Sequence, residues 1–374
     1  MKRYRMKTLA AALARRAGLY PAPQRCARPL RAPQRKATLG LASPGTASSG
    51  MGSAGKGSPG AGPRRTAARS MAVPGVLALG MALLAGACSS AASSAQGPGG
   101  TINAVGAENE YANVIQQIGG KYVHTSAVMS NPNTDPHTFE ASSRIAQEVS
   151  AAQLVVQNGV GYDNWANTIE NAAASPGRKV INVQKLIGLP DSTPNPHLWY
   201  KPETMPVVAD AIASDLAALQ PAHASYFRAN VRTFTASLAA WNKAIYAFRS
   251  AHAGVPVATT EPVADYMLQA AGADNLSPWA LQAGIMNGSD PSPQDVTAEK
   301  NLFSQHKVKA LLYNQQVTDS LTQSFIGLAK ANGIPVVGVY ETMPTPGYDY
   351  QSWMLAEVQD LQKAITGKVS TEKL

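Results

Sequence analysis

The sequence predicts an α/β protein of two lobes with parallel sheets, joined by one long helix and separated by a cleft. Short apolar strands alternate with helices over residues 101–219, and the same alternation resumes at residue 256. Such alternation is typical of parallel sheets that carry helices on their faces. A helical stretch without strands, 222–249, lies between the two regions. Hydrophobic residues make up 45% of the 374-residue chain, which is enough to build a sizeable core.

Runs of apolar residues, and the residues that cap them, place the individual elements. Ser142 stands where its hydroxyl can accept a hydrogen bond from a free backbone N–H at the start of a helix. In the first lobe we predict strands at 101–105, 123–128, 154–157 and 179–183, and helices at 110–118, 142–150 and 202–219. In the second lobe we predict strands at 256–259, 308–312 and 335–339, and helices at 263–271 and 321–331.

The segment 222–249 predicts one continuous helix between the lobes. It has 28 residues without Gly or Pro, which corresponds to about 42 Å of helix at 1.5 Å per residue. Apolar residues recur along it at spacings of three and four and form a single face. These residues are Phe227, Val231, Phe234, Leu238, Trp241 and Ile245. We therefore place the first lobe at 101–220, the connecting helix at 221–250 and the second lobe at 251–374.

The formal net charge of +9 and the pI near 9.5 would ordinarily suggest a nucleic-acid partner. The charges are unevenly distributed, however, because residues 1–87 hold 15 of the 32 Lys and Arg and none of the 23 Asp and Glu. Residues 88–374 therefore carry 17 basic and 23 acidic side chains, a formal net charge of −6. We expect no nucleic-acid partner, and the acidic excess favours a cationic ligand.

Residues 1–87 have the features of a basic leader that ends in a secretory signal peptide. Three arginines at 64–69 precede an uncharged apolar stretch, 71–87, which ends in small residues. A positive region, an apolar region and small residues before a cleavage point are typical of such a signal. The apolar stretch has 17 residues, which is short for a membrane-spanning helix. Since the first 63 residues do not fit a normal signal, we expect the true start at Met51 or Met71; an organelle-type transit segment of similar composition is the alternative.

Cys88 is the candidate lipidation residue. Small residues directly before a cysteine resemble the bacterial lipobox, which would make Cys88 the acylated first residue of the mature protein; a secreted protein with a free thiol is the alternative. The Ser-, Ala- and Gly-rich composition predicts a flexible tether over 88–100. We therefore expect an exported protein, lipid-anchored to the outer face of the bacterial cytoplasmic membrane. The other cysteine, Cys26, lies in the leader, so the mature chain has no cysteine pair for a disulfide.

Two histidines lie in Pro-His segments that are each followed by an aromatic residue two positions later. His137 lies in Asp-Pro-His-Thr-Phe, and His197 lies in Asn-Pro-His-Leu-Trp. Proline fixes its own φ angle and prevents a helix from running through the segment, so each imidazole is held on a rigid loop. Two such segments in one predicted lobe favour a site to which both side chains contribute.

Two carboxylates in the second lobe follow predicted strands directly. Glu261 and Glu341 come after the first and the last of these strands, and ligands of open α/β sheets gather at the carboxyl ends of strands. Two imidazoles and two carboxylates suit Zn²⁺ or Mn²⁺ better than soft Cu(I). The sequence therefore predicts one divalent metal ion between the lobes. Asp349 is the alternative fourth ligand, and Glu108 is a more remote one.

These residues resemble the metal-binding solute receptors of ABC importers, the zinc and manganese type called cluster A-I. The resemblance runs from Thr101 to the C-terminus and rests on four motifs. They are Asp135-Pro136-His137-x-Phe139-Glu140, Asn195-Pro196-His197-x-Trp199, Gly119-Gly120 and Tyr226-x-x-x-Asn230. The resemblance implies four metal ligands, His137, His197, Glu261 and Glu341. The last of these stands where the family usually has Asp.

The resemblance also implies a function. An extracytoplasmic lipoprotein of this kind captures Zn²⁺ or Mn²⁺, with Fe²⁺ less favoured, and delivers it to an ABC permease powered by an ATPase. We expect a monomer. We also expect no enzymatic activity, because four protein ligands leave little room for a reactive water on the metal ion. The alternatives are a surface adhesin or a metallohydrolase with the same metal site. The sequence has no His-Glu-x-x-His and no Gly-x-Ser-x-Gly motif, which weighs against hydrolysis.

Overall fold

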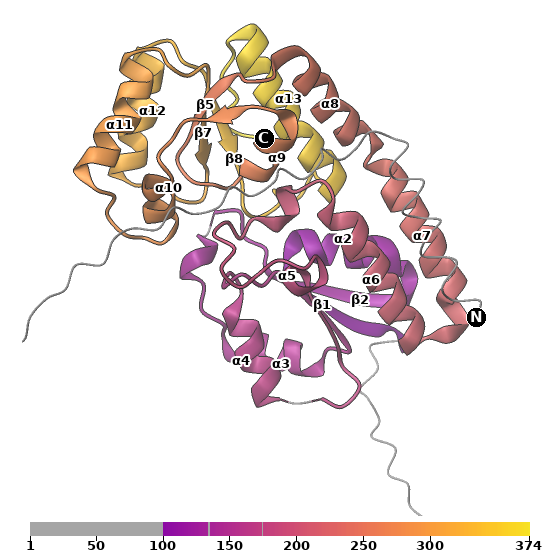
Figure 1. Ribbon diagram of the computed structural model, residues 1–374. Coiled ribbons are helices and arrows are strands. Elements are labelled where there is room, and N and C mark those ends of the chain that lie inside the picture. The colour runs from indigo at the N-terminus through magenta and orange to yellow at the C-terminus, as the bar shows by residue number, and fades with distance from the viewer. Residues whose placement is uncertain (1–99, 134, 174) are drawn as a thin grey trace, which may run out of the picture. The chain divides into compact units, whose positions relative to one another are not determined.

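The computed structural model describes residues 100–133, 135–173 and 175–374 and shows two α/β lobes beside a helical spine (Figure 1). The predicted fold class is confirmed, since each lobe has a four-stranded sheet whose strand pairs are all parallel. The predicted leader, Cys88 and nearly all of the tether lie outside the described residues. Within those residues, no helix is both long and apolar enough to cross a membrane. The predicted boundaries of the first lobe (101–220), the connecting helix (221–250) and the second lobe (251–374) stay predictions.

The first lobe has the strand order β2-β1-β3-β4. Its strands are β1 (Ile102–Glu108), β2 (Val123–Met129), β3 (Leu154–Gln157) and β4 (Lys179–Asn182). Its α-helices are α2 (Asn109–Gly119), α3 (Ser143–Ala151), α4 (Asn164–Ala172), α5 (Val183–Leu186) and α6 (Thr204–Leu219). Short 3-10 helices are η2 (Gly120–Tyr122), η3 (Pro136–Thr138), η4 (Leu198–Tyr200) and η5 (Pro221–His223). Ser142 caps α3 as predicted, because its hydroxyl accepts a hydrogen bond from the backbone N–H of Ile145.

The second lobe repeats this arrangement with the order β6-β5-β7-β8. Its strands are β5 (Pro256–Thr259), β6 (Asp274–Asn275), β7 (Leu311–Asn314) and β8 (Val336–Val339). Its helices are α9 (Asp265–Ala271), α10 (Trp279–Met286), α11 (Pro293–Ser304), α12 (Ser320–Ala331) and α13 (Tyr350–Gly367). The sequence prediction did not include α4, α5, β6, α10, α11 or α13, and it placed the start of β7 three residues too early.

The strand order creates one switch point in each sheet. The chain moves from β1 outward to β2 and then returns to the other side of β1 as β3, and β5, β6 and β7 follow the same path. The loops at the carboxyl ends of the strands on either side of such a point diverge and leave room for a ligand. Glu108 ends β1 and Asn314 ends β7, while Glu261 and Glu341 follow β5 and β8. The topology therefore places Glu108, Glu261 and Asn314 at the switch points, and Glu341 follows the neighbouring edge strand β8.

The connecting segment is two helices in succession, where the sequence predicted a single continuous helix. They are α7 (Ala224–Ser237) and α8 (Ala239–His252), and Leu238 separates them. The Ser237 hydroxyl donates a hydrogen bond to the carbonyl oxygen of Phe234 at 2.7 Å, and such back-bonding by serine bends helices. The first helix packs on α2 and α6, and the second packs on α9 and α13. Each half of the spine therefore belongs to one lobe.

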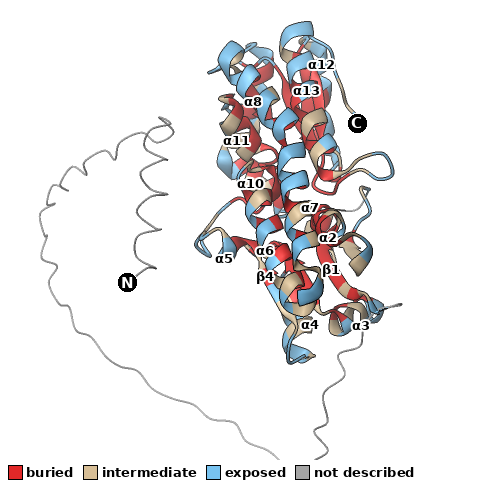
Figure 2. Ribbon diagram, turned by 90° about the vertical axis from the view of Figure 1, so that its right-hand side faces the viewer, coloured by how far each residue is buried: buried red, intermediate tan, exposed pale blue. Residues whose placement is uncertain are grey.

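Buried tyrosines join the two lobes next to the spine. Tyr350 of α13 donates to the carbonyl oxygen of Trp199 at 2.6 Å, and Tyr200 donates to the carbonyl oxygen of Tyr340 at 2.7 Å. Trp199, Tyr200 and Tyr350 are fully buried in a hydrophobic core that includes residues of both lobes. Figure 2 shows the buried residues on the strands and the inward helix faces, with exposed residues on the outer helix faces. The lobes are thus fixed to each other on the spine side.

One buried acid in this region predicts a pH dependence of stability. Glu357 accepts a hydrogen bond from Trp353 Nε1 at 2.9 Å and lies 3.1 Å from the Tyr200 hydroxyl. Burial raises the pKa of Glu357 to about 8, although these hydrogen bonds lower it. Its contribution to stability is therefore present below its ordinary pKa and is lost as the pH rises through about 8.

Changing Glu357→Gln removes this titration and is expected to stabilise the metal-free variant relative to the wild type as the pH rises from 5 to 9. The relative gain should be on the order of 1–3 kcal/mol. This range lies below the upper limit, which is about 1.4 kcal/mol for each unit by which the pKa of Glu357 is shifted. Urea unfolding at both pH values measures it. Glu203, whose side chain is 74% exposed, supplies the control Glu203→Gln. Equal pH dependence in all three proteins would contradict the prediction.

Candidate metal-binding site

His137 lies on η3, in the loop that follows β2. The backbone N–H of His137 donates to Asp135 Oδ1 at 2.8 Å, which makes Asp135 the cap of this short helix. The proline at position 136 fixes the first position of the turn, as the sequence predicted. The side chain of His137 is 16% exposed, whereas that of His197 is 0% exposed. His137 is therefore the imidazole on the solvent side of the pair.

His197 is held by the amide of Asn195. Asn195 Oδ1 lies 3.0 Å from the backbone nitrogen of His197 and 2.7 Å from its Nδ1, while Asn195 Nδ2 donates to the carbonyl oxygen of Pro262 at 2.7 Å. Because the amide oxygen faces Nδ1, this ring nitrogen carries the proton and Nε2 carries the free lone pair. Asn195 thus orients the ring and connects it to the second lobe. Such a partner is a common feature of metal-binding histidines.

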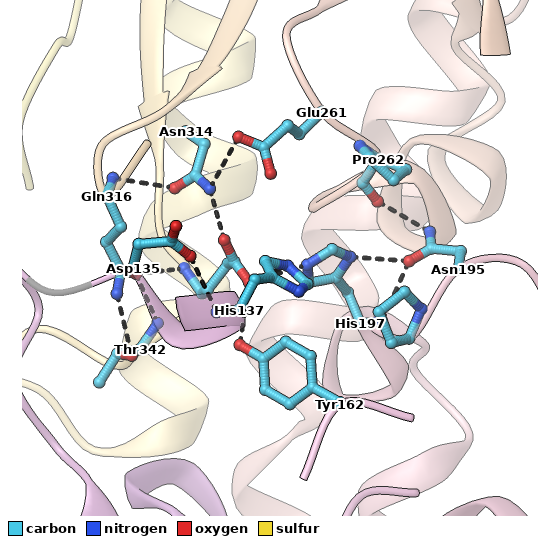
Figure 3. A network of polar contacts seen from close by, with 12 residues as sticks. Asp135, His137, Tyr162, Asn195, His197, Glu261, Pro262, Asn314, Gln316 and Thr342 are labelled. Carbon is cyan, nitrogen blue, oxygen red and sulfur yellow. Dashed lines mark hydrogen bonds and ion pairs between the residues drawn. The ribbon is translucent and has the colours of Figure 1, made fainter. Parts of the chain in front are cut away.

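Glu341 brings together the two histidines, which are labelled in Figure 3. The Oε2 atom of Glu341 lies 3.1 Å from Nε2 of His137 and 3.1 Å from Nε2 of His197. Potential ligand atoms of these three residues all lie within 4.8 Å of one another, and they form a group that fits a metal ion. Donor atoms about 3 Å apart are expected around an ion with bonds of about 2.0–2.1 Å. The structure therefore joins two predicted ligands of the first lobe with one of the second.

Glu261 lies beside this group but outside the set of three. Asn314 Nδ2 donates to Glu261 Oε1 at 3.2 Å and also to Glu341 Oε1. The other oxygen, Glu261 Oε2, is buried and has no hydrogen-bond partner, and Figure 3 shows it on the side of the carboxylate that faces the imidazoles. A buried, unpaired carboxylate oxygen is costly unless a cation or a proton compensates it. Glu261 Oε2 is therefore suited to be the fourth ligand atom. The role of Glu261 as a metal ligand stays a prediction.

Two residues of the site were not predicted from the sequence. The Tyr162 hydroxyl donates to Glu341 Oε2 at 2.9 Å, and its ring contacts His137 edge-on at a centroid distance of 5.2 Å. Asn314 bridges the two carboxylates as described. Asn314 ends a strand of the second sheet, so the strand-end argument that identified Glu261 and Glu341 would have found it. No local signal pointed to Tyr162, which reaches the site only through the fold.

The two remaining acids considered from the sequence have other surroundings. Asp349 Oδ1 accepts from the backbone N–H of Ser352 at 2.9 Å and caps α13. The structure therefore brings Glu341, and not Asp349, to the histidines. Glu108 is 2% exposed at the end of β1, and neither of its carboxylate oxygens has a hydrogen-bond partner. Glu108 lies outside the group of His137, His197 and Glu341.

The electrostatics of the site favour a bound cation. Burial raises the pKa of Glu261 well above its usual value, and the neighbouring charge of Glu341 raises it further. Burial would also raise the pKa of Glu341, but the two imidazoles outweigh it and hold that pKa below its usual range. Burial lowers the pKa of His197, which keeps this ring neutral as a metal ligand must be. In the described part of the chain, no Lys or Arg forms an ion pair with either carboxylate.

The pKa of His137 shifts the other way. Burial lowers it, but the Glu341 carboxylate and Asp135 raise it by more, so the net direction is upward. A proton on His137 would balance part of the negative charge when no metal is present. A divalent ion would replace that proton, because the imidazole must be neutral to coordinate. The pKa values of the two histidines thus shift in opposite directions although both imidazoles approach the same carboxylate oxygen.

Two parallel-sheet lobes with imidazole and carboxylate donors meeting between them define a metal-binding substrate-binding protein. The sequence model of the family described as "Zinc-uptake complex component A periplasmic" (ZnuA) matches residues 105–364, and the chain belongs to this family. The resemblance inferred from the Pro-His segments is thereby confirmed. Members of this family are solute-binding receptors and not enzymes, so the metallohydrolase alternative is not retained.

Individual relatives are distant in sequence and similar in fold. "Manganese-binding lipoprotein MntA" of Bacillus subtilis is 23% identical over 238 residues, which is 60% of this chain and 74% of MntA. The structure of the SBP FpvC from Pseudomonas aeruginosa in complex with Mn²⁺ aligns with a TM-score of 0.60 at 19% identity, covering 72% of this chain and 99% of FpvC. The laminin-binding protein Lbp of Streptococcus pyogenes aligns with a TM-score of 0.58 at 18% identity, covering 71% and 99%.

Proposed function

We propose that this protein captures one divalent cation, Zn²⁺ or Mn²⁺, between its lobes and delivers it to an ABC import permease. The ligands are His137, His197, Glu261 and Glu341. The observation that carries the proposal is the approach of two imidazole Nε2 atoms, each at 3.1 Å, to the same buried Glu341 oxygen. When both imidazoles are neutral, their Nε2 lone pairs and the Glu341 oxygen can all coordinate one cation that lies between them.

The donor set supports a cargo ion held entirely by protein. Two nitrogen and two oxygen donors suit a borderline divalent ion, and the two carboxylates neutralise its charge. His197 and Glu341 are 0% exposed and Glu261 is 2% exposed, whereas the side chain of His137 is 16% exposed. We infer that the ion reaches the site past His137, with the first lobe supplying the imidazoles and the second lobe supplying the carboxylates.

We also propose where the protein is located and with which partners it acts. The protein is anchored through lipidated Cys88 on the outer face of the cytoplasmic membrane, acts as a monomer, and hands its ion to a permease driven by an ATPase. The family assignment and the name of the relative MntA, a manganese-binding lipoprotein, support this part. The tyrosine hydrogen bonds beside the spine favour small lobe movements, because they would have to break in a wide opening.

A surface adhesin remains the second candidate. The observation that favours it is the likeness of fold to a laminin-binding protein. Adhesion does not exclude metal binding, since one chain can carry out both through different surfaces.

Metal binding by the purified protein tests the proposal. After removal of metal by a chelator, titration with Zn²⁺ or with Mn²⁺ should show one ion bound per chain, measured by calorimetry and by elemental analysis after dialysis. Affinity should fall as the pH is lowered, because protons compete for the histidines and carboxylates. A chain that binds no ion, or that binds several ions with equal weak affinity, would refute the proposed site. Binding of laminin that is independent of metal would instead support the adhesin.

A further inference from the structure

The side chain of Asn314 is the only described group that contacts the carboxylates of both Glu261 and Glu341 by hydrogen bonds. Asn314 ends β7 and is 1% exposed. Its Oδ1 accepts from the backbone N–H of Gln316 at 2.9 Å. Because the amide oxygen is engaged on that side, both hydrogens of Nδ2 are directed toward the carboxylates.

Each of these two hydrogens has its own carboxylate. One goes to Glu261 Oε1 at 3.2 Å, and the other goes to Glu341 Oε1. The remaining oxygens differ from these two in their surroundings. Glu341 Oε2 accepts from the Tyr162 hydroxyl and faces the imidazoles, and Glu261 Oε2 is buried without a hydrogen-bond partner. A single amide thus engages one oxygen of each carboxylate.

We propose that Asn314 makes both carboxylates single-oxygen ligands and thereby gives the site a preference for Zn²⁺ over Mn²⁺. This inference rests on the proposed function, since it concerns which ion the same site selects. Two imidazole nitrogens and two single oxygens amount to four donors, the number that Zn²⁺ takes in closed tetrahedral sites. Mn²⁺ prefers a larger, oxygen-rich shell, which a bidentate carboxylate would help to provide. An Oε1 atom occupied by the Asn314 amide does not supply that extra donor.

A second set of contacts keeps Glu341 from rotating out of this arrangement. Gln316 Oε1 accepts from the backbone N–H groups of Glu341 and Thr342, both at 2.7 Å, and Gln316 Nε2 donates to the Thr342 hydroxyl at 3.0 Å. The backbone that carries the carboxylate is therefore fixed by the same short segment, 314–316, that holds its Oε1 atom. Ligands fixed by such partners keep their geometry when the metal changes, and this is a source of selectivity.

Cobalt spectroscopy and metal competition test the inference. Four-coordinate Co²⁺ absorbs visible light far more strongly than six-coordinate Co²⁺, so it reports the number of donors directly. The wild-type protein loaded with Co²⁺ is expected to show the strong absorption. In Asn314→Ala the freed Oε1 atoms can join the shell, so the absorption should fall severalfold. The ratio of the Mn²⁺ to the Zn²⁺ dissociation constant should also fall, by about tenfold or more.

Two further variants separate this role from a general loss of stability. Asn275→Ala removes an amide of the same lobe that bonds to Thr259, Asp265 and Gln282 and to none of the four proposed ligands. It should lower stability while leaving the cobalt spectrum and the metal preference unchanged. Asn314→Ser keeps one hydroxyl donor and should give an intermediate spectrum and preference.

The outcomes distinguish the two levels of the proposal. If the wild type binds metal but its cobalt complex absorbs weakly, or if Asn314→Ala keeps both the spectrum and the preference, the role of Asn314 is wrong and the receptor function stands. If the wild type binds neither Zn²⁺, Mn²⁺ nor Co²⁺, the proposed function itself is overturned. The wild-type spectrum alone decides the coordination number, even where a variant fails to fold.

Discussion

Replacing His197 with alanine is expected to weaken metal binding by about a hundredfold to a thousandfold. Protein zinc sites with four ligands have binding free energies of about 10–16 kcal/mol. Losing one of four donors should therefore cost about 3–4 kcal/mol, and each 1.4 kcal/mol is tenfold in the dissociation constant. The remaining carboxylate would also lose one of the two imidazoles that it faces at 3.1 Å. Competition with a chromophoric chelator measures the change.

His223→Ala is the matched control. His223 lies on η5 and stacks on Tyr122 at a ring-centroid distance of 3.7 Å, and it belongs to no part of the site group. Its replacement should cost some packing energy at the surface of the first lobe and leave the metal affinity unchanged. If the two variants lost affinity equally, the assignment of the site to His197 would have to be abandoned.

Removing the metal ion is expected to lower the free energy of unfolding by about 4 kcal/mol when the free ion had been present at about 1,000 times its dissociation constant. An ion that binds only the folded state stabilises it by mass action, and the unfolded chain holds no preformed site. The structural reason is local: the buried Glu261 and Glu341 carboxylates share one amide, and without the ion no metal charge offsets the burial and the mutual repulsion that raise the pKa of Glu261. Urea unfolding with and without chelator measures the difference.

His197→Ala also serves as the control for this experiment. Because the variant should bind metal weakly, chelator should change its stability much less than that of the wild type. A wild-type protein whose unfolding curve is the same with and without chelator would show that the ion is not coupled to folding. The stabilisation by the metal ion should decrease as the pH falls, because protons compete with the ion for its ligands.

Local patterns were sufficient to predict most of the framework. Strands β3 and β5 begin and end at the residues predicted from apolar runs, and Ser142 caps α3 because N-capping depends on one hydroxyl and a few neighbouring N–H groups. The two Pro-His segments form short, rigid turns for the same reason, since proline restricts its own residue and the one before it. These effects act over a few residues, so they can be predicted from the local sequence.

The predictions failed where distant contacts decide the structure. The break at Leu238 is a different case, because it lies beside a local hydrogen bond from Ser237 to Phe234 and the apolar periodicity continues across it. Helix α13 was not predicted, although it carries Tyr350 and Glu357 into the core between the lobes. The cross-lobe partners of these side chains lie about 150 residues away in sequence, so no local window contains the information.

The sequence by itself determined the two lobes, the rigid loops that carry His137 and His197, and the kinds of donor atom at the strand ends, because all of these follow from short-range periodicity, proline geometry and strand topology. Only the tertiary structure decided that Glu341 and not Asp349 meets the imidazoles and that Asn314 joins the two carboxylates. Distances between side chains of different elements depend on how the two lobes pack. That packing is the sum of many contacts distributed over the whole chain.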